Sequence, residues 1–147
     1  MSLETRKRAG EKSLRLARED DMGRADRAVE IKHSKNNCCQ AVLLAFADEL
    51  GMTEEQLRQL GSPFGLGMGA MEGTCGALVG AEMVLGLARS DGGQMRRDAS
   101  ELLDRFVVRC GAERCADLKG RDTGVMLCPC DDCVRNAVIE CERALRA

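Results

Sequence analysis

Apolar residues recur every three to four positions through most of the chain beyond residue 23. That period places them on one face of an α-helix, where they can pack into a core. No segment shows the strict alternation that is typical of a half-buried strand. The pattern predicts an all-α fold, a helical bundle of five or six helices. These span about residues 24–32, 38–50, 54–60, 75–88, 94–110 and 131–146, with one or two further turns over 113–118.

Local residues mark the helix ends and one unusual connection. Asn37 precedes a helix whose free amides its side chain can cap, and Thr53 begins a capping-box pattern. Five glycines fall within residues 61–73, which predicts a Gly-rich loop between helices that turns sharply or lets backbone approach closely. The loop lacks the Gly-Lys-Ser/Thr ending of a phosphate-binding loop. We expect it to clear space near a site at Cys75.

The distribution of charge divides the chain into two parts. Residues 1–23 are rich in charged side chains and predict an N-terminal helix or arm, and residues 24–147 predict a single cysteine-rich helical domain. Gly76 and Gly80 are small residues four positions apart on one predicted helix. Because small residues let helices pack closely, we include a homodimer among the expected assemblies.

Composition excludes several classes of partner. The net charge is −2, and the chain has no Trp, no Tyr and three Phe, so it lacks both the field and the aromatic platforms that bind nucleic acid. No apolar stretch reaches the roughly 18 residues that a membrane-spanning helix needs. Residues 1–30 lack the apolar run of a signal peptide. With nine cysteines, we expect a reducing cytoplasm, where thiols serve metal or redox chemistry.

The cysteines themselves show where that chemistry lies. Cys38 and Cys75 fall at the starts of two predicted helices, where the positive end of the helix dipole favours thiolate. Near the C-terminus, Cys130 and Cys133 form a CxxC pair just after Cys128. Such a pair can bind a metal ion or form a redox disulfide. The sequence contains one histidine, which excludes histidine-rich zinc and di-iron sites.

The order of these cysteines resembles the family of redox-active proteins named for the pattern C_GCAxxG_C_C. The resemblance covers about residues 24–146. It rests on a CGAxxG segment, two further cysteine segments and a cysteine that opens the last helix: Cys75–Gly80, Asn37–Val42, Arg114–Gly120 and Cys133. What the resemblance implies is one redox site formed by four cysteines: Cys38, Cys75, Cys115 and Cys133.

The chain departs from the family pattern in having five further cysteines: Cys39, Cys110, Cys128, Cys130 and Cys141. Cys128 or Cys130 could replace Cys133 as the last ligand, and the additional thiols could build a second site. We interpret Cys110 and Cys141 as core residues, because a free cysteine often behaves as a small hydrophobe. For Cys39 both roles stay open.

Three functions fit such a site. Four thiolates could hold an iron–sulfur cluster for electron transfer or sensing, or the same ligands could hold zinc. A metal-free thiol–disulfide oxidoreductase would use Cys38 or Cys75 as the attacking thiol, with Cys130 and Cys133 as the resolving pair. A binding module for soft ions such as copper or arsenic is the third. We expect a redox partner protein in the first two cases, and neither nucleic acid nor a membrane as a partner.

Overall fold

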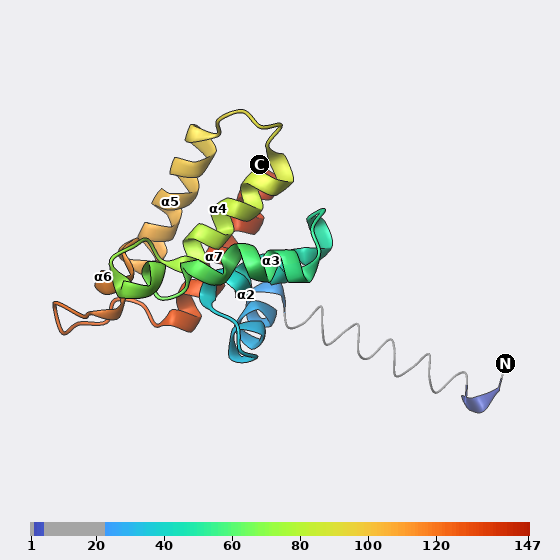
Figure 1. Ribbon diagram of the computed structural model, residues 1–147, viewed down its shortest axis with the longest axis horizontal. Coiled ribbons are helices and arrows are strands. Elements are labelled where there is room, and N and C mark those ends of the chain that lie inside the picture. Colours follow the sequence, from blue (N-terminus) through green and yellow to red (C-terminus); the bar gives the residue numbers. More distant parts are fainter. Residues whose placement is uncertain (1, 5–22) are drawn as a thin grey trace.

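The structure is a computed structural model that describes residues 2–4 and 23–147 (Figure 1). Residues 23–33 form a helix, and six labelled α-helices follow: α2 (Cys38–Ala45), α3 (Glu54–Gly61), α4 (Gly76–Arg89), α5 (Arg96–Cys110), α6 (Cys115–Lys119) and α7 (Cys130–Arg146). Three short turns complete the fold: η1 (Ala47–Glu49), η2 (Ser62–Phe64) and η3 (Gly67–Met71). Within the described residues there is no strand, only an isolated bridge between Thr74 and Arg114. The predicted all-α fold is confirmed.

The N-terminal arm predicted over residues 1–23 lies largely outside the described residues, so the division into arm and domain stays a prediction. Across the part of the chain that is described, no helix combines the length and the apolar character needed to cross a bilayer.

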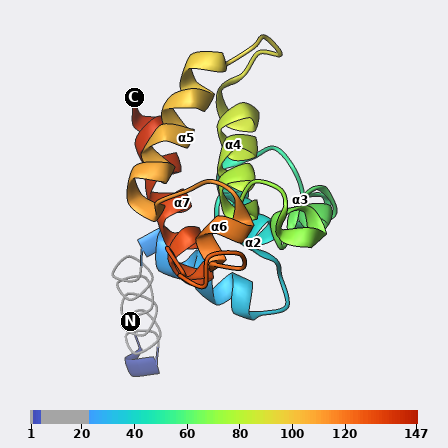
Figure 2. The same ribbon diagram turned by 90° about the vertical axis from the view of Figure 1, so that its left-hand side faces the viewer.

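Helix α4 is the centre of the bundle. It packs against α2 on one side and α7 on another, α7 packs against α5, and α3 covers α2. Figures 1 and 2 show α4, α5 and α7 running side by side, with α2, α3 and α6 near the end where α4 begins. Fully buried side chains from these helices fill the core, among them Phe46, Leu78, Phe106 and Val138. This packing places several helix starts close together.

Small residues on α4 serve the contact with α2. A Cβ on Gly80 would lie 2.9 Å from the carbonyl oxygen of Cys39 and 3.1 Å from the Cβ of Val42. The small-residue face that suggested close packing is therefore occupied within the chain by α2. The homodimer stays a prediction without support from this face.

Capping residues fix the start of α2. Asn37 accepts a hydrogen bond from the Gln40 amide at 2.8 Å, and the Gln40 side chain accepts one from the Asn37 amide at 2.9 Å. The Asn37 side chain also donates to the carbonyl oxygens of Gly61 and Ser62, at 3.1 and 3.2 Å. Asn37 thus caps α2 and also holds the start of the Gly-rich segment against the start of α2.

Candidate functional site

Four helices begin around one cavity of about 220 Å³. Cys38 is the first residue of α2, Cys75 precedes α4 as its N-cap, Cys115 is the first residue of α6, and Cys130 is the first residue of α7. All four line the cavity. Because free amides and the positive end of the helix dipole lie at a helix start, such positions favour thiolate.

The cavity gathers every cysteine that the sequence assigned to the site. Its lining includes the four expected from the family pattern and both possible substitutes: Cys38, Cys75, Cys115, Cys133, Cys128 and Cys130. Of these, Cys130 is partly exposed and the others are buried. Lys32 and Lys119 also line it and contribute positive charge. Which cysteine of α7 completes a set of four is taken up below as a proposal.

A backbone bridge sets Cys75 and Cys115 side by side. The Cys75 amide donates to the carbonyl oxygen of Glu113 at 2.7 Å, and the Cys115 amide donates to that of Gly73 at 3.0 Å. These two bonds flank the bridge between Thr74 and Arg114. They bring two cysteines that are forty positions apart in the sequence to the same wall of the cavity.

Ion pairs on the protein surface join the two segments that form this bridge. The Glu72 carboxylate accepts hydrogen bonds from Arg114 and Arg121, both at 2.7 Å. These two guanidinium groups lower the pKa of Glu72. The pairs are exposed, so their role is to orient α6 and its flanking loop rather than to supply much stability.

The Gly-rich segment lies beside the cavity, near the site at Cys75 where the sequence predicts it. Gly67 has a φ of +55°, and a Cβ there would lie 2.5 Å from the Cβ of Cys115. Leu66 beside it lines the cavity and has a φ of 53°. The segment is not an irregular loop throughout. Residues 62–64 form the short 3₁₀-helix η2, and residues 67–71 form the π-helical turn η3.

Cys38 and Cys130 form one thiol pair. The hydrogen bond with Cys38 lowers the pKa of Cys130 to about 6, and the charges of Lys32 and Lys119 act in the same direction. The same contact raises the pKa of Cys38. The contact therefore favours the thiolate form of Cys130 and the protonated form of Cys38.

Cys75 is the acceptor in a second pair, with Cys133 as the donor. This hydrogen bond lowers the pKa of Cys75, and the amides of Ala77 and Leu78 at the start of α4 add to the effect. The pKa of Cys133 is raised, because it donates to Cys110 and to Cys75 and is buried. The pKa of Cys75 is thus lowered chiefly by Cys133, and the start of α4 adds to this effect.

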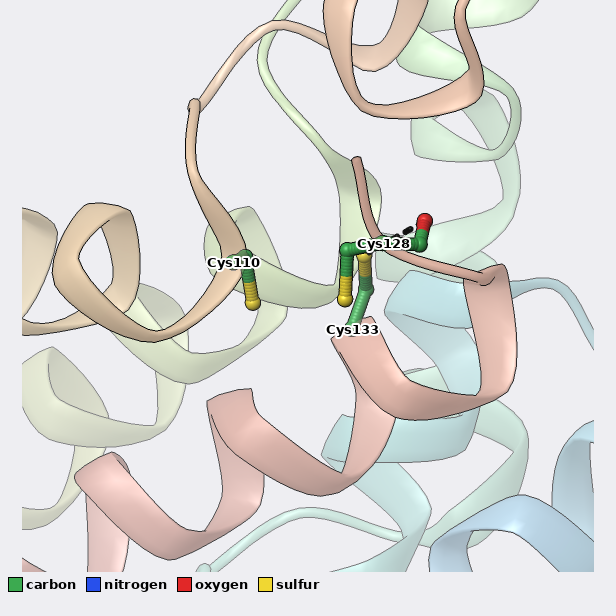
Figure 3. Close-up of side chains that lie close together, drawn as sticks. All are labelled: Cys110, Cys128 and Cys133. Carbon is green, nitrogen blue, oxygen red and sulfur yellow. Dashed lines mark hydrogen bonds between the residues drawn. The ribbon is translucent and has the colours of Figure 1, made fainter. Parts of the chain in front are cut away.

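A third cysteine group contains two of the additional cysteines; the sequence allowed a second site but did not identify these members. The ligand atoms of Cys110, Cys128 and Cys133 all lie within 4.8 Å of one another. Figure 3 shows the three side chains converging from the end of α5, the loop before α7 and the first turn of α7. The Cys133 thiol also donates to the Cys128 carbonyl oxygen at 3.7 Å. Cys110 is buried, as its interpretation as a core residue predicts, but that interpretation missed this cluster.

The remaining candidates lie outside the cavity lining. Cys39 is fully buried between α2 and α4, and burial raises its pKa to about 12. Cys141 is fully buried, and its thiol donates to the Ala81 carbonyl oxygen at 3.5 Å, in agreement with a core role. His33 is largely exposed and pairs with Asp131 at 2.9 Å.

The donors that face the cavity are sulfur atoms. Soft thiolate ligands suit zinc, Cu(I) and iron–sulfur clusters, and the cysteines present fit a group of this kind. The fold and the cavity therefore define an all-helical, cysteine-rich protein with a buried thiol cluster that could bind metal.

Comparison with known families gives the particular assignment. Residues 36–144 match the family described as "Putative redox-active protein (C_GCAxxG_C_C)". The chain belongs to this family, and the resemblance noted in the sequence is confirmed. No curated protein and no solved structure matches the chain.

Proposed function

We propose that the thiol-lined cavity holds an iron–sulfur cluster, used for electron transfer or sensing in the cytoplasm. The observation that carries the proposal is the convergence of four helix starts, each with a cysteine in the cavity wall. Thiolates are the usual ligands of such clusters. When bound, the cluster supplies one-electron chemistry at a potential tuned by burial and hydrogen bonds to sulfur.

The proposed ligands are Cys38, Cys75, Cys115 and a cysteine from the first turn of α7. Cys130 fits the fourth place better than Cys133. Cys130 is hydrogen-bonded to Cys38. Its charge also acts to raise the pKa of Cys75 and the pKa of Cys115, so both lie near it. Cys133 contacts Cys110 and Cys128 as well as Cys75.

The surroundings of the cavity support a negatively charged group. Lys32 and Lys119 in its lining offset thiolate charge, and the amides of Ala77 and Leu78 point to the sulfur of Cys75. Leu66 contributes to the cavity wall, and the neighbouring Gly67 packs against Cys115.

Thiol–disulfide exchange is the second candidate, and the contact between Cys38 and Cys130 favours it. The Cys130 thiolate would attack a partner disulfide, forming a mixed disulfide and releasing one partner thiolate. Cys38 would then displace the second partner thiolate, leaving a Cys38–Cys130 disulfide and a reduced partner. Two electrons pass to the partner, one of its thiolates takes up the proton that Cys38 releases, and the other takes up a proton from solvent.

Anaerobic purification of the full chain distinguishes the two candidates. A cluster predicts visible absorbance together with iron and sulfide, and Cys115→Ser is expected to lose both. Cys141→Ser is the matched control, since Cys141 is a buried cysteine in the core, and it should retain them. A colourless wild-type chain with one zinc would overturn the cluster. A change in free-thiol count on mild oxidation with a disulfide, lost in Cys38→Ser, would support exchange.

A further inference from the structure

We propose that Cys110, Cys128 and Cys133 form a second metal site, for a thiophilic ion that is satisfied by three thiolates, such as Cu(I) or As(III). With Cys130 as the fourth cluster ligand, this site shares no cysteine with the cluster proposed above. Cys128 and Cys133 line the same cavity, whereas Cys110 comes from the end of α5 and is not part of the lining. The family pattern of four cysteines does not include Cys110.

The geometry of the three thiols favours one ion. Their ligand atoms all lie within 4.8 Å of one another, so a small shift would place all three on a common centre. The residues come from three separate segments that converge on this point (Figure 3). Packing of α5 against α7 holds Cys110 over the first turn of α7. A site built from separate, packed segments is rigid before the ion arrives.

The number of donors identifies the class of ion. Among the described residues, the group contains no fourth His, Cys, Asp or Glu. Zinc takes four ligands in structural sites, and here it would need water as the fourth. The three cysteines are only 2%, 5% and 2% exposed, which leaves little access for that water. Soft, low-coordinate ions need only the three sulfurs, and thiolates select them.

A neighbouring amide orients one ligand. The Asn136 side chain donates to the Cys110 sulfur at 3.4 Å. Hydrogen bonds of this kind from residues that do not touch the metal fix a ligand in position. The Arg109 guanidinium, on the preceding residue, adds positive charge beside the same sulfur.

The first turn of α7 can serve both sites at once. Cys130 opens the helix toward the cluster cavity, and Cys133 lies within the triad. The second site is therefore compatible with the proposed function but does not depend on it. Binding of Cu(I) is an exchange of protons for the ion, because each thiol that coordinates releases its proton to solvent. With arsenite the three thiol protons leave with the three hydroxides as water, and in neither case are electrons transferred.

The test uses the full chain purified without oxygen, with its iron and visible absorbance recorded first. Cu(I) is then added in competition with a Cu(I) chelator, and bound copper is counted. We expect one tightly held Cu(I) per chain, with X-ray absorption showing three sulfur neighbours. Copper bound by two sulfurs, or by nitrogen or oxygen, would overturn the site without the need for any variant.

Variants then assign the ligands. Cys110→Ser and Cys128→Ser should each lose the tightly held copper. Cys110→Ser, whose residue lies outside the cavity lining, should also keep the iron content of the wild type, and Cys141→Ser should keep both copper and iron. If Cys128→Ser retains as much copper as the wild type, the proposal is overturned. This test holds even if Cys110→Ser fails to fold, because Cys128 lies in a loop and not in a helix. Repeating the titration with arsenite shows which ion the site prefers.

The experiment distinguishes failure of the proposed iron–sulfur cluster from failure of the second metal site. If the wild-type chain carries no iron, the proposed function fails, and the triad is still tested by comparing Cys110→Ser with Cys115→Ser. The triad predicts that only the former loses the first copper equivalent. Equal loss in both variants would show one undivided thiol pool and overturn the second site.

Discussion

Gly76 lies directly against the sulfur of Cys38. A Cβ on Gly76 would lie 2.5 Å from the Cys38 Sγ, and it would also collide with the carbonyl oxygen of Phe64. This contact gives the second position of the CGAxxG segment a physical meaning. The segment supplies a thiol at Cys75 and, at the next residue, the space that admits the thiol from α2.

The first prediction concerns Gly76→Ala. The added methyl group cannot fit without moving Cys38, so we expect the variant to lose most of the bound metal. Overpacking of this kind destabilises by about 1–3 kcal/mol. Metal content per chain and denaturant unfolding measure the two effects. A Gly76→Ala protein with wild-type metal content would contradict the role assigned to this glycine.

The second prediction compares two glycines of the same helix. Gly80→Ala would place a Cβ 2.9 Å from the Cys39 carbonyl oxygen, so it should separate α2 from α4 and destabilise by about 1–3 kcal/mol. Gly86→Ala meets nothing within 4 Å and should stabilise by about 0.5–1 kcal/mol through better helix propensity. Urea unfolding of both variants measures the contrast. Equal changes in the free energy of unfolding would show that the small residues of α4 are not needed for its contact with α2.

The third prediction concerns a buried ion pair between α5 and α7. The Glu140 side chain is 2% exposed. Its Oε1 accepts a hydrogen bond from the Nε of Arg109, and the two atoms are 2.5 Å apart. Its second carboxylate oxygen is buried without a hydrogen-bond partner. Arg109→Met removes the main partner of this charge and should cost about 3 kcal/mol, the lower end for a broken buried pair, because Arg143 still lies 3.4 Å away.

The matched control is the double variant Arg109→Met with Glu140→Met, which removes the stranded charge as well. It should recover much of the lost stability, because well-packed apolar side chains can replace a buried ion pair. Thermal unfolding of the set gives the coupling energy. A double variant less stable than either single one would mean that each side chain stabilises the fold independently, and it would contradict the explanation by a stranded charge.

The fourth prediction concerns pH. Burial raises the pKa of the Glu82 carboxyl from an ordinary 4.5 to about 7. The folded chain therefore holds a proton that the unfolded chain releases, and this contribution to stability is complete below about pH 4.5 and lost as the pH rises to about 7. Glu82→Gln should be more stable than the wild type at pH 8, with the difference shrinking at lower pH.

Denaturant midpoints of both proteins from pH 5 to 8 measure this fourth effect. Glu101→Gln provides the control, because its side chain is on the surface of α5 and paired with Arg97. A Glu82→Gln difference that is constant across this range would show that the carboxyl does not titrate there.

The helices could be predicted from the sequence because apolar residues recur at helical spacing, and α2 and α3 also have capping signals at their starts. The capping role of Asn37 and the box at Thr53 are local, and both are found in the structure. The cysteines at helix starts could be recognised for the same reason. The position of a thiol at the first turn depends on sequence neighbours alone.

What the sequence could not reveal depends on packing between distant segments. Nothing local connects Cys110 with Cys133, which meet only because α5 lies along α7. The Gly-rich segment is a second case. Leu66 and Met68 adopt positive φ values of 53° and 59°, which side chains other than glycine seldom do. Their conformations are imposed by the surrounding fold, including the close approach of Gly67 to Cys115.

The cavity wall contains cysteines from positions 38, 75, 115, 128, 130 and 133. When the chain is synthesised from its N-terminus, the last of these thiols is made only after α2 to α6. A metal or cluster bound as proposed would therefore enter late in synthesis and would link segments from across the helical domain. Its free energy of binding becomes free energy of folding, so the loaded protein should resist unfolding and proteolysis as one unit.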